Sequence, residues 1–195
     1  MKKIILIRHG ESKWNTLKKI QGQKDISLTD KGLKQAQLIS NRLAKEKIDK
    51  IYSSDLRRAY LTAEAIGNKI GLGVTPMKEF REINFGIWEG MSNDKMLQEF
   101  YDDVLIWRSN PEKLKIKGAE SIEELQKRAM KGINRIIDDN AEHDNLLIVS
   151  HSATIKTIIL GLLNMDLTYF KNLTISNVGL TIIEFREYNR VLKVL

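Results

Sequence analysis

Two runs of four apolar residues predict the centre of the fold. Residues 4–7 and 146–149 are continuously hydrophobic, which is typical of strands buried on both faces of a parallel sheet. Arg8 and His9 directly follow the first run, and His151 follows the second after a single serine. Because ligands bind at the carboxyl ends of strands in open α/β sheets, these polar residues are the first candidates for chemistry.

Apolar residues at helical spacing predict amphipathic helices between the strands. The three clearest stripes are Leu33, Ala36, Ile39 and Leu43; Ala59, Ala63, Ile66 and Ile70; and Leu125, Ala129, Ile133 and Ile136. A further helix is expected over about 153–163, and shorter strands over 48–54, 74–77, 180–185 and 191–195. This alternation predicts an α/β fold, a three-layer sandwich in which helices flank a mostly parallel central sheet.

One segment, residues 92–117, interrupts the alternation of strands and helices. Its apolar residues recur at helical spacing until Pro111 ends the pattern. We interpret it as a helical insertion, which either covers the site as a lid or is an ordinary surface helix. No linker, repeat or low-complexity tract divides the chain, so residues 1–195 are expected to form a single domain.

Composition narrows the classes of partner. The 32 basic and 25 acidic residues give a net charge of +7, which attracts anions, but the basic residues alternate with acidic ones and no aromatic stacking platform indicates nucleic acid. No apolar run approaches the roughly 20 residues that span a bilayer, and the run before Arg8 is too short for a secretory signal. We therefore expect a cytoplasmic protein with no membrane partner.

Cofactors are not expected either. The chain has no cysteine, which excludes disulfides and thiolate zinc sites. Its three histidines, His9, His143 and His151, stand in no metal-ligand spacing.

The helix after the second strand offers an anion site. Residues 53–55 provide capping side chains, and Arg57 lies in the first turn, where free N–H groups and an arginine suit a phosphate. Arg58 should point elsewhere, because consecutive helical residues differ by about 100°. We interpret Arg58 as a surface residue that forms an ion pair.

Two other segments supply candidate contacts. A turn rich in aromatic residues and glycine could hold a carboxylic acid that gives a proton to a leaving group, and on spacing alone Glu82 and Glu89 are both eligible. Residues 13–25 are expected to form a loop over the strand end, with Asn15 and Gln21 as its candidate contacts.

Together these groups match the requirements of phosphoryl transfer. That reaction needs a nucleophile, cations for the equatorial oxygens and a proton for the leaving alkoxide. A neutral imidazole, the arginines and a carboxylic acid supply them in turn, without metal or thiol.

An ordered series of motifs spans most of the chain. It comprises Arg8-His9-Gly10-Glu11-Ser12, Trp14-Asn15, Gln21-Gly22, Leu28-Thr29-x-x-Gly32-x-x-Gln35-Ala36, Ser53-Ser54-Asp55-Leu56-x-Arg58-Ala59, Glu82-x-x-Phe85-Gly86-x-Trp88-Glu89-Gly90 and Ser150-His151. This series resembles the histidine phosphatase superfamily, also called the phosphoglycerate mutase-like family.

The resemblance implies a mechanism through phosphohistidine. His9 would be the phosphorylated nucleophile, and Glu82 rather than Glu89 the proton donor. The implied catalytic residues are His9, Glu82 and His151, and the implied phosphate-binding residues are Arg8, Arg57, Asn15, Gln21 and Ser152. Many relatives have glycines after the second histidine, whereas this chain has Ser152-Ala153, where a backbone N–H can still contact phosphate.

The compact chain is more similar to the phosphatase branch than to the longer cofactor-dependent mutases. The expected function is that of a metal-independent phosphomonoesterase acting on a small phosphorylated metabolite, a class that includes α-ribazole phosphate and phosphoserine. A phosphoglycerate mutase is the alternative. A non-catalytic polyanion-binding module is a third hypothesis, against which the full set of candidate catalytic residues argues. The sequence leaves open the natural substrate and the oligomeric state, a homodimer included.

Overall fold

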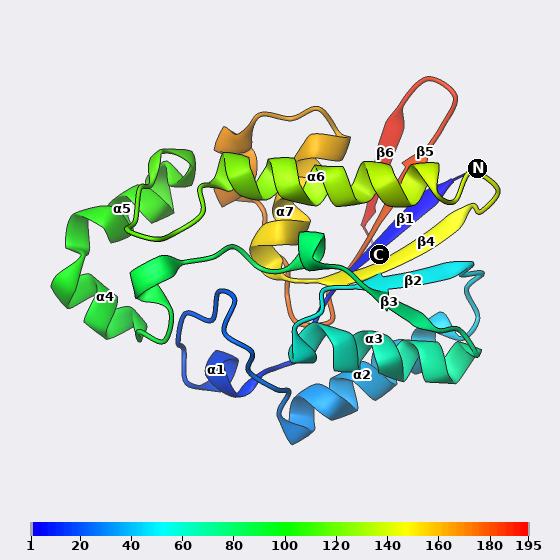
Figure 1. Ribbon diagram of the computed structural model, residues 1–195, viewed down its shortest axis with the longest axis horizontal. Helices are drawn as coiled ribbons and strands as arrows, with labels where there is room; N and C mark the ends of the chain where they lie inside the picture. The colour runs from blue at the N-terminus through cyan, green and yellow to red at the C-terminus, as the bar shows by residue number, and fades with distance from the viewer. Residues whose placement is uncertain (1, 195) are drawn as a thin grey trace.

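The computed structural model describes residues 2–194, which form a six-stranded sheet between two layers of helices (Figure 1). The strands are β1 Lys3–Arg8, β2 Lys50–Ser53, β3 Val74–Pro76, β4 Asn145–Ser150, β5 Leu180–Phe185 and β6 Arg190–Val194. Their order in the sheet is β3-β2-β4-β1-β5-β6. The first four are mutually parallel, whereas β5 runs antiparallel to both of its neighbours. The predicted α/β fold with a mostly parallel sheet is therefore confirmed.

Four long helices cover the two faces of the sheet: α2 Asp30–Leu43, α3 Arg57–Ile70, α6 Ile122–Asp138 and α7 Ser152–Leu162. Alternate residues of β1 point to opposite faces, as the strand period requires. Ile4 and Leu6 pack with α6 and α7, while Ile5 and Ile7 pack with α2 and α3. Burial on both faces is why the central strands are continuous apolar runs.

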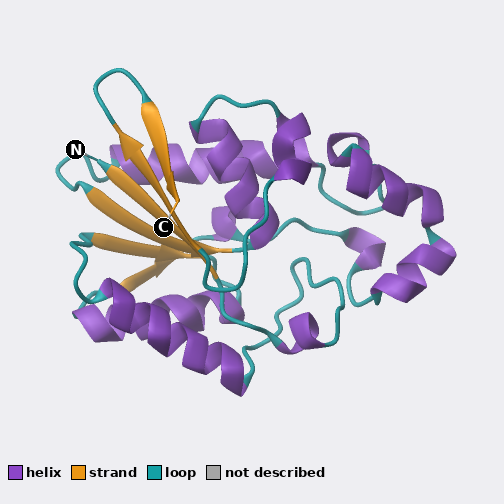
Figure 2. Cartoon of the chain, turned by 180° about the vertical axis from the view of Figure 1, so that it is seen from behind, coloured by secondary structure: helices purple, strands orange, loops and turns teal. Residues whose placement is uncertain are grey.

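The insertion consists of two helices rather than one. These are α4 Asn93–Glu99 and α5 Tyr101–Ser109, separated at Phe100 and followed by a short 3-10 helix, η3 Pro111–Lys113. They extend beyond the sheet in both views (Figures 1 and 2). A role as a lid stays a prediction.

The stripe predicted for α2 is wrong at one residue. Leu33 is half exposed, and Gly32 takes its place on the buried side with Ala36, Ile39 and Leu43. A Cβ on Gly32 would collide with the backbone of Glu11. The absence of a side chain therefore lets α2 begin against the chain just after β1.

Gly10 is the other half of this close approach. A Cβ there would lie 2.6 Å from the carbonyl oxygen of Gly32. A side chain at this position is therefore excluded, because α2 passes directly beside Gly10.

The starts of α6 and α3 are capped in different ways. The capping box at Ser121 and Glu124 is present at the start of α6. At α3, however, the N-cap is Leu56, and no side chain of its own segment caps the helix. Instead Asp25 accepts a hydrogen bond from the backbone N–H of Arg57 at 2.7 Å.

The loop over residues 13–25 contains a short helix, α1 Lys13–Thr16, which the polar sequence did not indicate. At the other end of the chain, the predicted last strand is present as β6, and its expected final residue, Leu195, lies outside the described residues. Within residues 2–194, no helix combines the length and apolar character needed to cross a membrane.

Candidate active site

Two histidines meet where β1 and β4 end. The strands are parallel neighbours, with Arg8 opposite Ser150, and the backbone N–H of His9 donates to the carbonyl of Ser150 at 3.0 Å. The ring centroids of His9 and His151 lie 5.1 Å apart, and both side chains are buried. The parallel pairing of the two strands thus brings His9 and His151 together.

The ring of His9 is held in one orientation. Its Nδ1 lies 2.6 Å from the carbonyl oxygen of Gly10. Since a carbonyl oxygen only accepts, Nδ1 must carry the proton, and Nε2 keeps its lone pair. The peptide that follows the ring is fixed as well, because Asn177 donates from Nδ2 to the carbonyl of His9 at 2.9 Å.

Two arginines accompany the histidine pair, and they are Arg8 and Arg58. Both lie close enough to lower the pKa of His9, although burial is the larger cause. Burial also lowers the pKa of Arg58 to about 10, against the opposing charge of Glu82. At that value the guanidinium group of Arg58 stays positively charged at neutral pH.

The predicted orientations of Arg57 and Arg58 are therefore reversed. Arg57 is exposed, whereas Arg58 is completely buried. The reason is helical phase: Arg58 lies on the same face as Thr62 and Ile66, at intervals of four residues, and this face packs on the sheet. Arg57 lies about 100° away from that face, in solvent.

Several buried polar nitrogen atoms at this cluster have no hydrogen-bond partner among residues 2–194. They are both ring nitrogens of His151 and the Nε atoms of Arg8 and Arg58. Buried polar groups are nearly always paired, so unpaired ones require an explanation. Four such atoms, on His151 and on two arginines, indicate a binding site for an anion.

Glu82 lies beside this cluster, where its carboxyl group contacts the N-terminus of α7. Its carboxylate accepts hydrogen bonds from the backbone N–H groups of Ala153 and Thr154 at 3.4 and 3.3 Å, and from the hydroxyl of Thr154 at 3.3 Å. These hydrogen bonds fix the carboxyl group at the N-terminus of α7. Glu82 is thus held against the backbone of the two residues that lie two and three positions after His151.

Glu89 has a different environment. Its Oε1 accepts from the backbone N–H of Gln23 at 2.8 Å and from that of Phe85 at 3.3 Å. The carboxylate closes the turn at Gly22, where any Cβ would overlap it. Spacing left the two glutamates equivalent, and their contacts separate them: Glu89 holds a loop, while Glu82 borders the histidines.

The remaining candidates lie around the loop over residues 13–25. Asn15 Oδ1 accepts from the backbone N–H of Ser12 at 3.0 Å. The single hydroxyl proton of Ser12 lies between two acceptors, Gln21 Oε1 at 2.6 Å and Asn15 Oδ1 at 3.0 Å. Asn177 reaches Asn15 at 3.4 Å and so connects this loop to His9. Ser152 is the first residue of α7.

Arg58 joins that loop to the site. Its two terminal nitrogens donate to the carbonyls of Lys24 and Gly22, each at 2.8 Å. Its Nε remains unpaired among the described residues. One guanidinium therefore both anchors the loop and contributes charge beside the histidines.

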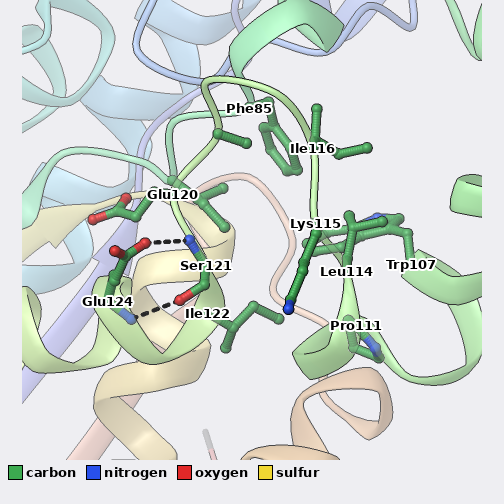
Figure 3. A pocket seen from close by; sticks show the side chains of 12 residues that line it. Phe85, Trp107, Pro111, Leu114, Lys115, Ile116, Glu120, Ser121, Ile122 and Glu124 are labelled. Carbon is green, nitrogen blue, oxygen red and sulfur yellow. Dashed lines mark hydrogen bonds between the residues drawn. The ribbon is translucent and has the colours of Figure 1, made fainter.

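A cavity of about 210 Å³ lies at the base of the insertion, between η3 and the start of α6 (Figure 3). Phe85, Trp107, Leu114 and Ile116 contribute apolar walls. Neither histidine lines it. The cavity is therefore distinct from the polar cluster, although Ile83, the neighbour of Glu82, is one of its lining residues.

A family model decides what this arrangement is. The model described as histidine phosphatase superfamily (branch 1) matches residues 4–195. The chain belongs to this superfamily.

Similar proteins agree with the assignment. Phosphoserine phosphatase 1 of Hydrogenobacter thermophilus is 33% identical over 192 residues, which cover 98% of this chain and 90% of that protein. A probable phosphoglycerate mutase of Yersinia pestis is 31% identical over 191 residues, covering 96% of this chain and 86% of the relative. A solved mycobacterial glucosyl-3-phosphoglycerate phosphatase, complexed with VO3, has a TM-score of 0.93 at 25% identity and covers 100% of this chain and 99% of its own.

The resemblance inferred from the motifs is thus confirmed, and with it the assignment to the phosphomonoester hydrolases. Sequence reasoning from periodicity missed Arg58, although the quoted motif contains it and its four-residue interval to Thr62 was a usable signal. It also missed Asn177. No local pattern marks that residue, because its partners lie more than 160 positions away.

The buried histidines of this histidine phosphatase make its stability depend on pH. Burial, followed by the charge of Arg58, lowers the pKa of both His9 and His151 well below 6.5. Below about pH 6.5 the unfolded chain therefore binds protons that the folded chain does not. This contribution to stability is complete above the unfolded value and is lost as the pH falls toward the folded values.

We accordingly expect the urea midpoint of unfolding to fall between pH 7.5 and 5.5, and to fall less in His151→Gln. Urea denaturation at several pH values in this range measures how steeply the midpoint depends on pH in each protein. Equal slopes in the two proteins would contradict a buried, neutral His151.

Proposed function

We propose that the protein hydrolyses small phosphomonoesters by two displacements at His9. In the first, Nε2 of His9 attacks phosphorus, the ester P–O bond breaks, and Glu82 gives its proton to the leaving oxygen. In the second, Glu82 takes a proton from a water molecule as that water attacks the phosphohistidine, and the P–N bond breaks to release phosphate. The supporting observation is the fixed tautomer of His9, with an unprotonated Nε2 beside two arginines.

Each residue of the cluster has a role in this scheme. Arg8 and Arg58 neutralise the phosphoryl oxygens, for which their unpaired Nε donors are available among the described residues. His151 is neutral and buried, and donates one further hydrogen bond. The backbone at Ser152 and the side chains of Asn15 and Gln21 are proposed as additional contacts. Because Arg57 is exposed, Arg58 replaces it in the proposal.

The acceptor of the phosphoryl group distinguishes a phosphatase from a mutase. We expect 3-phosphoglycerate to yield free phosphate at a rate that a 2,3-bisphosphoglycerate primer does not raise. Phosphate release and isomer formation are measured in the same reaction. Primer-dependent isomerisation without net release of phosphate would make the protein a mutase, the activity in the name of the Yersinia relative.

The half-buried Lys156 bears on the class of substrate. It lies on α7, one turn after Ser152, with its ammonium 4.6 Å from the ring centroid of Phe170. Burial lowers its pKa, and the charge of Glu82 opposes the shift. Lys156 forms no ion pair among the described residues. We propose that it binds a carboxylate of the substrate, a group that phosphoserine and 3-phosphoglycerate share.

Replacement of Lys156 with Met tests this specificity. We expect the KM for phosphoserine to rise by about tenfold, the value of one charge-assisted hydrogen bond, and the KM for p-nitrophenyl phosphate, which has no carboxylate, to stay within about twofold. Steady-state kinetics with both substrates measures the difference, and Lys127→Met, at an exposed position of α6, is the control. An equal rise for both substrates would contradict the proposal.

A further inference from the structure

Arg128, on α6, binds the segment of chain that carries Glu82. Its terminal nitrogens lie within hydrogen-bond distance of four backbone carbonyls, those of Lys78, Glu79, Arg81 and Glu82, at 3.3, 2.8, 3.1 and 3.3 Å. One guanidinium thus holds both ends of the turn that leads into Glu82. The helix can come this close because Gly132 has no side chain to strike Phe80.

Glu120 completes the arrangement from the opposite side. Its carboxylate forms a two-point ion pair with Arg128, with both N–O distances at 2.8 Å, and also accepts from the backbone N–H of Asn84 at 3.3 Å. The backbone N–H of Glu120 donates to the carbonyl of Asn84 at 2.8 Å. In Figure 3 its carboxylate points away from the apolar cavity. The chain is therefore bound on both sides of Glu82.

We infer that the Arg128–Glu120 pair is a positioning device for the acid and base Glu82, an inference that rests on the proposed function. Of Glu82 itself, Arg128 contacts only the backbone carbonyl, so it is not a catalytic residue and would act by positioning Glu82. The planar fork of a guanidinium can serve a carboxylate and several carbonyls at once, which a lysine ammonium cannot reproduce. The pair also connects Glu82 to the point where the insertion returns to α6.

The dependence of rate on the leaving group separates this role from a general loss of structure. Phosphoserine releases an alkoxide that needs a proton, whereas p-nitrophenyl phosphate releases a stable phenolate that needs almost none. A misplaced Glu82 therefore slows formation of the phosphoenzyme from the first substrate far more than from the second. Single-turnover measurements of the appearance of serine or nitrophenolate isolate this step.

We expect Arg128→Met to slow single turnover of phosphoserine by about 100-fold and that of p-nitrophenyl phosphate by no more than about threefold. Arg128→Lys should fall between Arg128→Met and wild type. The matched control is Arg135→Met, on the same helix, because Arg135 pairs at 2.9 Å with Glu79 and has no hydrogen bond to residues 81–84 among the contacts of the described chain. It should leave both rates within about twofold.

Glu82→Gln calibrates the assay. If it shows strong discrimination and Arg128→Met and Arg128→Lys slow both substrates equally, the pair is merely structural and the positioning inference is overturned while the proposed function stands. If Glu82→Gln itself slows both substrates equally, Glu82 is not the acid, and the proposed function and the inference both fail. Discrimination in both Glu82→Gln and Arg128→Met supports the inference.

Discussion

Replacing His9 with Ala is expected to reduce kcat for phosphoserine by about 10⁴-fold or more, because no other group in the cluster can form the covalent intermediate. His151 is the nearest imidazole, with its ring centroid 5.1 Å away, but it lacks the hydrogen bond to Gly10 that fixes the tautomer of His9. Phosphate release over hours, with the variant at high concentration, measures the residual rate.

A second histidine variant, His143→Ala, is the control for loss of activity through general damage to the fold. His143 lies in the turn before β4, at the opposite end of that strand from His151. His143→Ala should keep kcat within about twofold of wild type. Activity of His9→Ala above about a tenth of wild type would show that the reaction does not pass through this histidine.

The second large effect is expected at Arg58. Arg58→Met removes a guanidinium that lies beside His9 and also holds the carbonyls of Gly22 and Lys24. We expect kcat/KM to fall by about 10²- to 10³-fold, the typical cost of removing a donor to a charged transition state. The neighbouring Arg57→Met should change kcat/KM by less than about twofold, since that side chain is in solvent.

Loss of the loop contacts alone could also lower activity, so the charge is tested separately. Arg58→Lys keeps a cation but cannot serve both carbonyls and an anion in one plane. We expect it to recover only part of kcat/KM. An equal fall of kcat/KM in Arg57→Met and in Arg58→Met would contradict the orientation of the two side chains in the structure.

Much of the fold was predictable because burial imposes simple patterns. The runs at 4–7 and 146–149 are buried on both faces, so they had to be continuously apolar, and their parallel pairing brought His9 and His151 together. The capping box that starts α6 was equally readable, because its two residues are three apart in the chain.

The failures have a common physical origin in long-range packing. Leu33 was assigned to the buried stripe of α2, but Gly32, which packs against the backbone after β1, takes its place on the buried side. The cap of α3 comes from Asp25, 32 residues before the N–H it accepts from. Neither contact leaves a trace in local spacing.

The prediction for Arg58 failed for a different reason. A charge in the buried stripe of a helix contradicts the rule that polar residues face solvent, and such departures are expected at functional sites. Its phase with Thr62 was visible in the sequence, and the quoted motif contained it. The choice of Glu82 over Glu89 was implied by the family resemblance alone, whereas their contacts distinguish them directly.

The most direct test of a phosphohistidine at His9 uses Glu82→Gln with p-nitrophenyl phosphate. This leaving group needs little acid catalysis, so the first displacement proceeds, whereas hydrolysis of the phosphoenzyme lacks its base and slows. We predict a burst of about one equivalent of nitrophenolate per chain, with acid-labile phosphate mapped to His9 by mass spectrometry after an alkaline quench, and no burst in the same variant carrying His9→Ala. A burst that persists without His9, or phosphate found on another residue, would contradict the account.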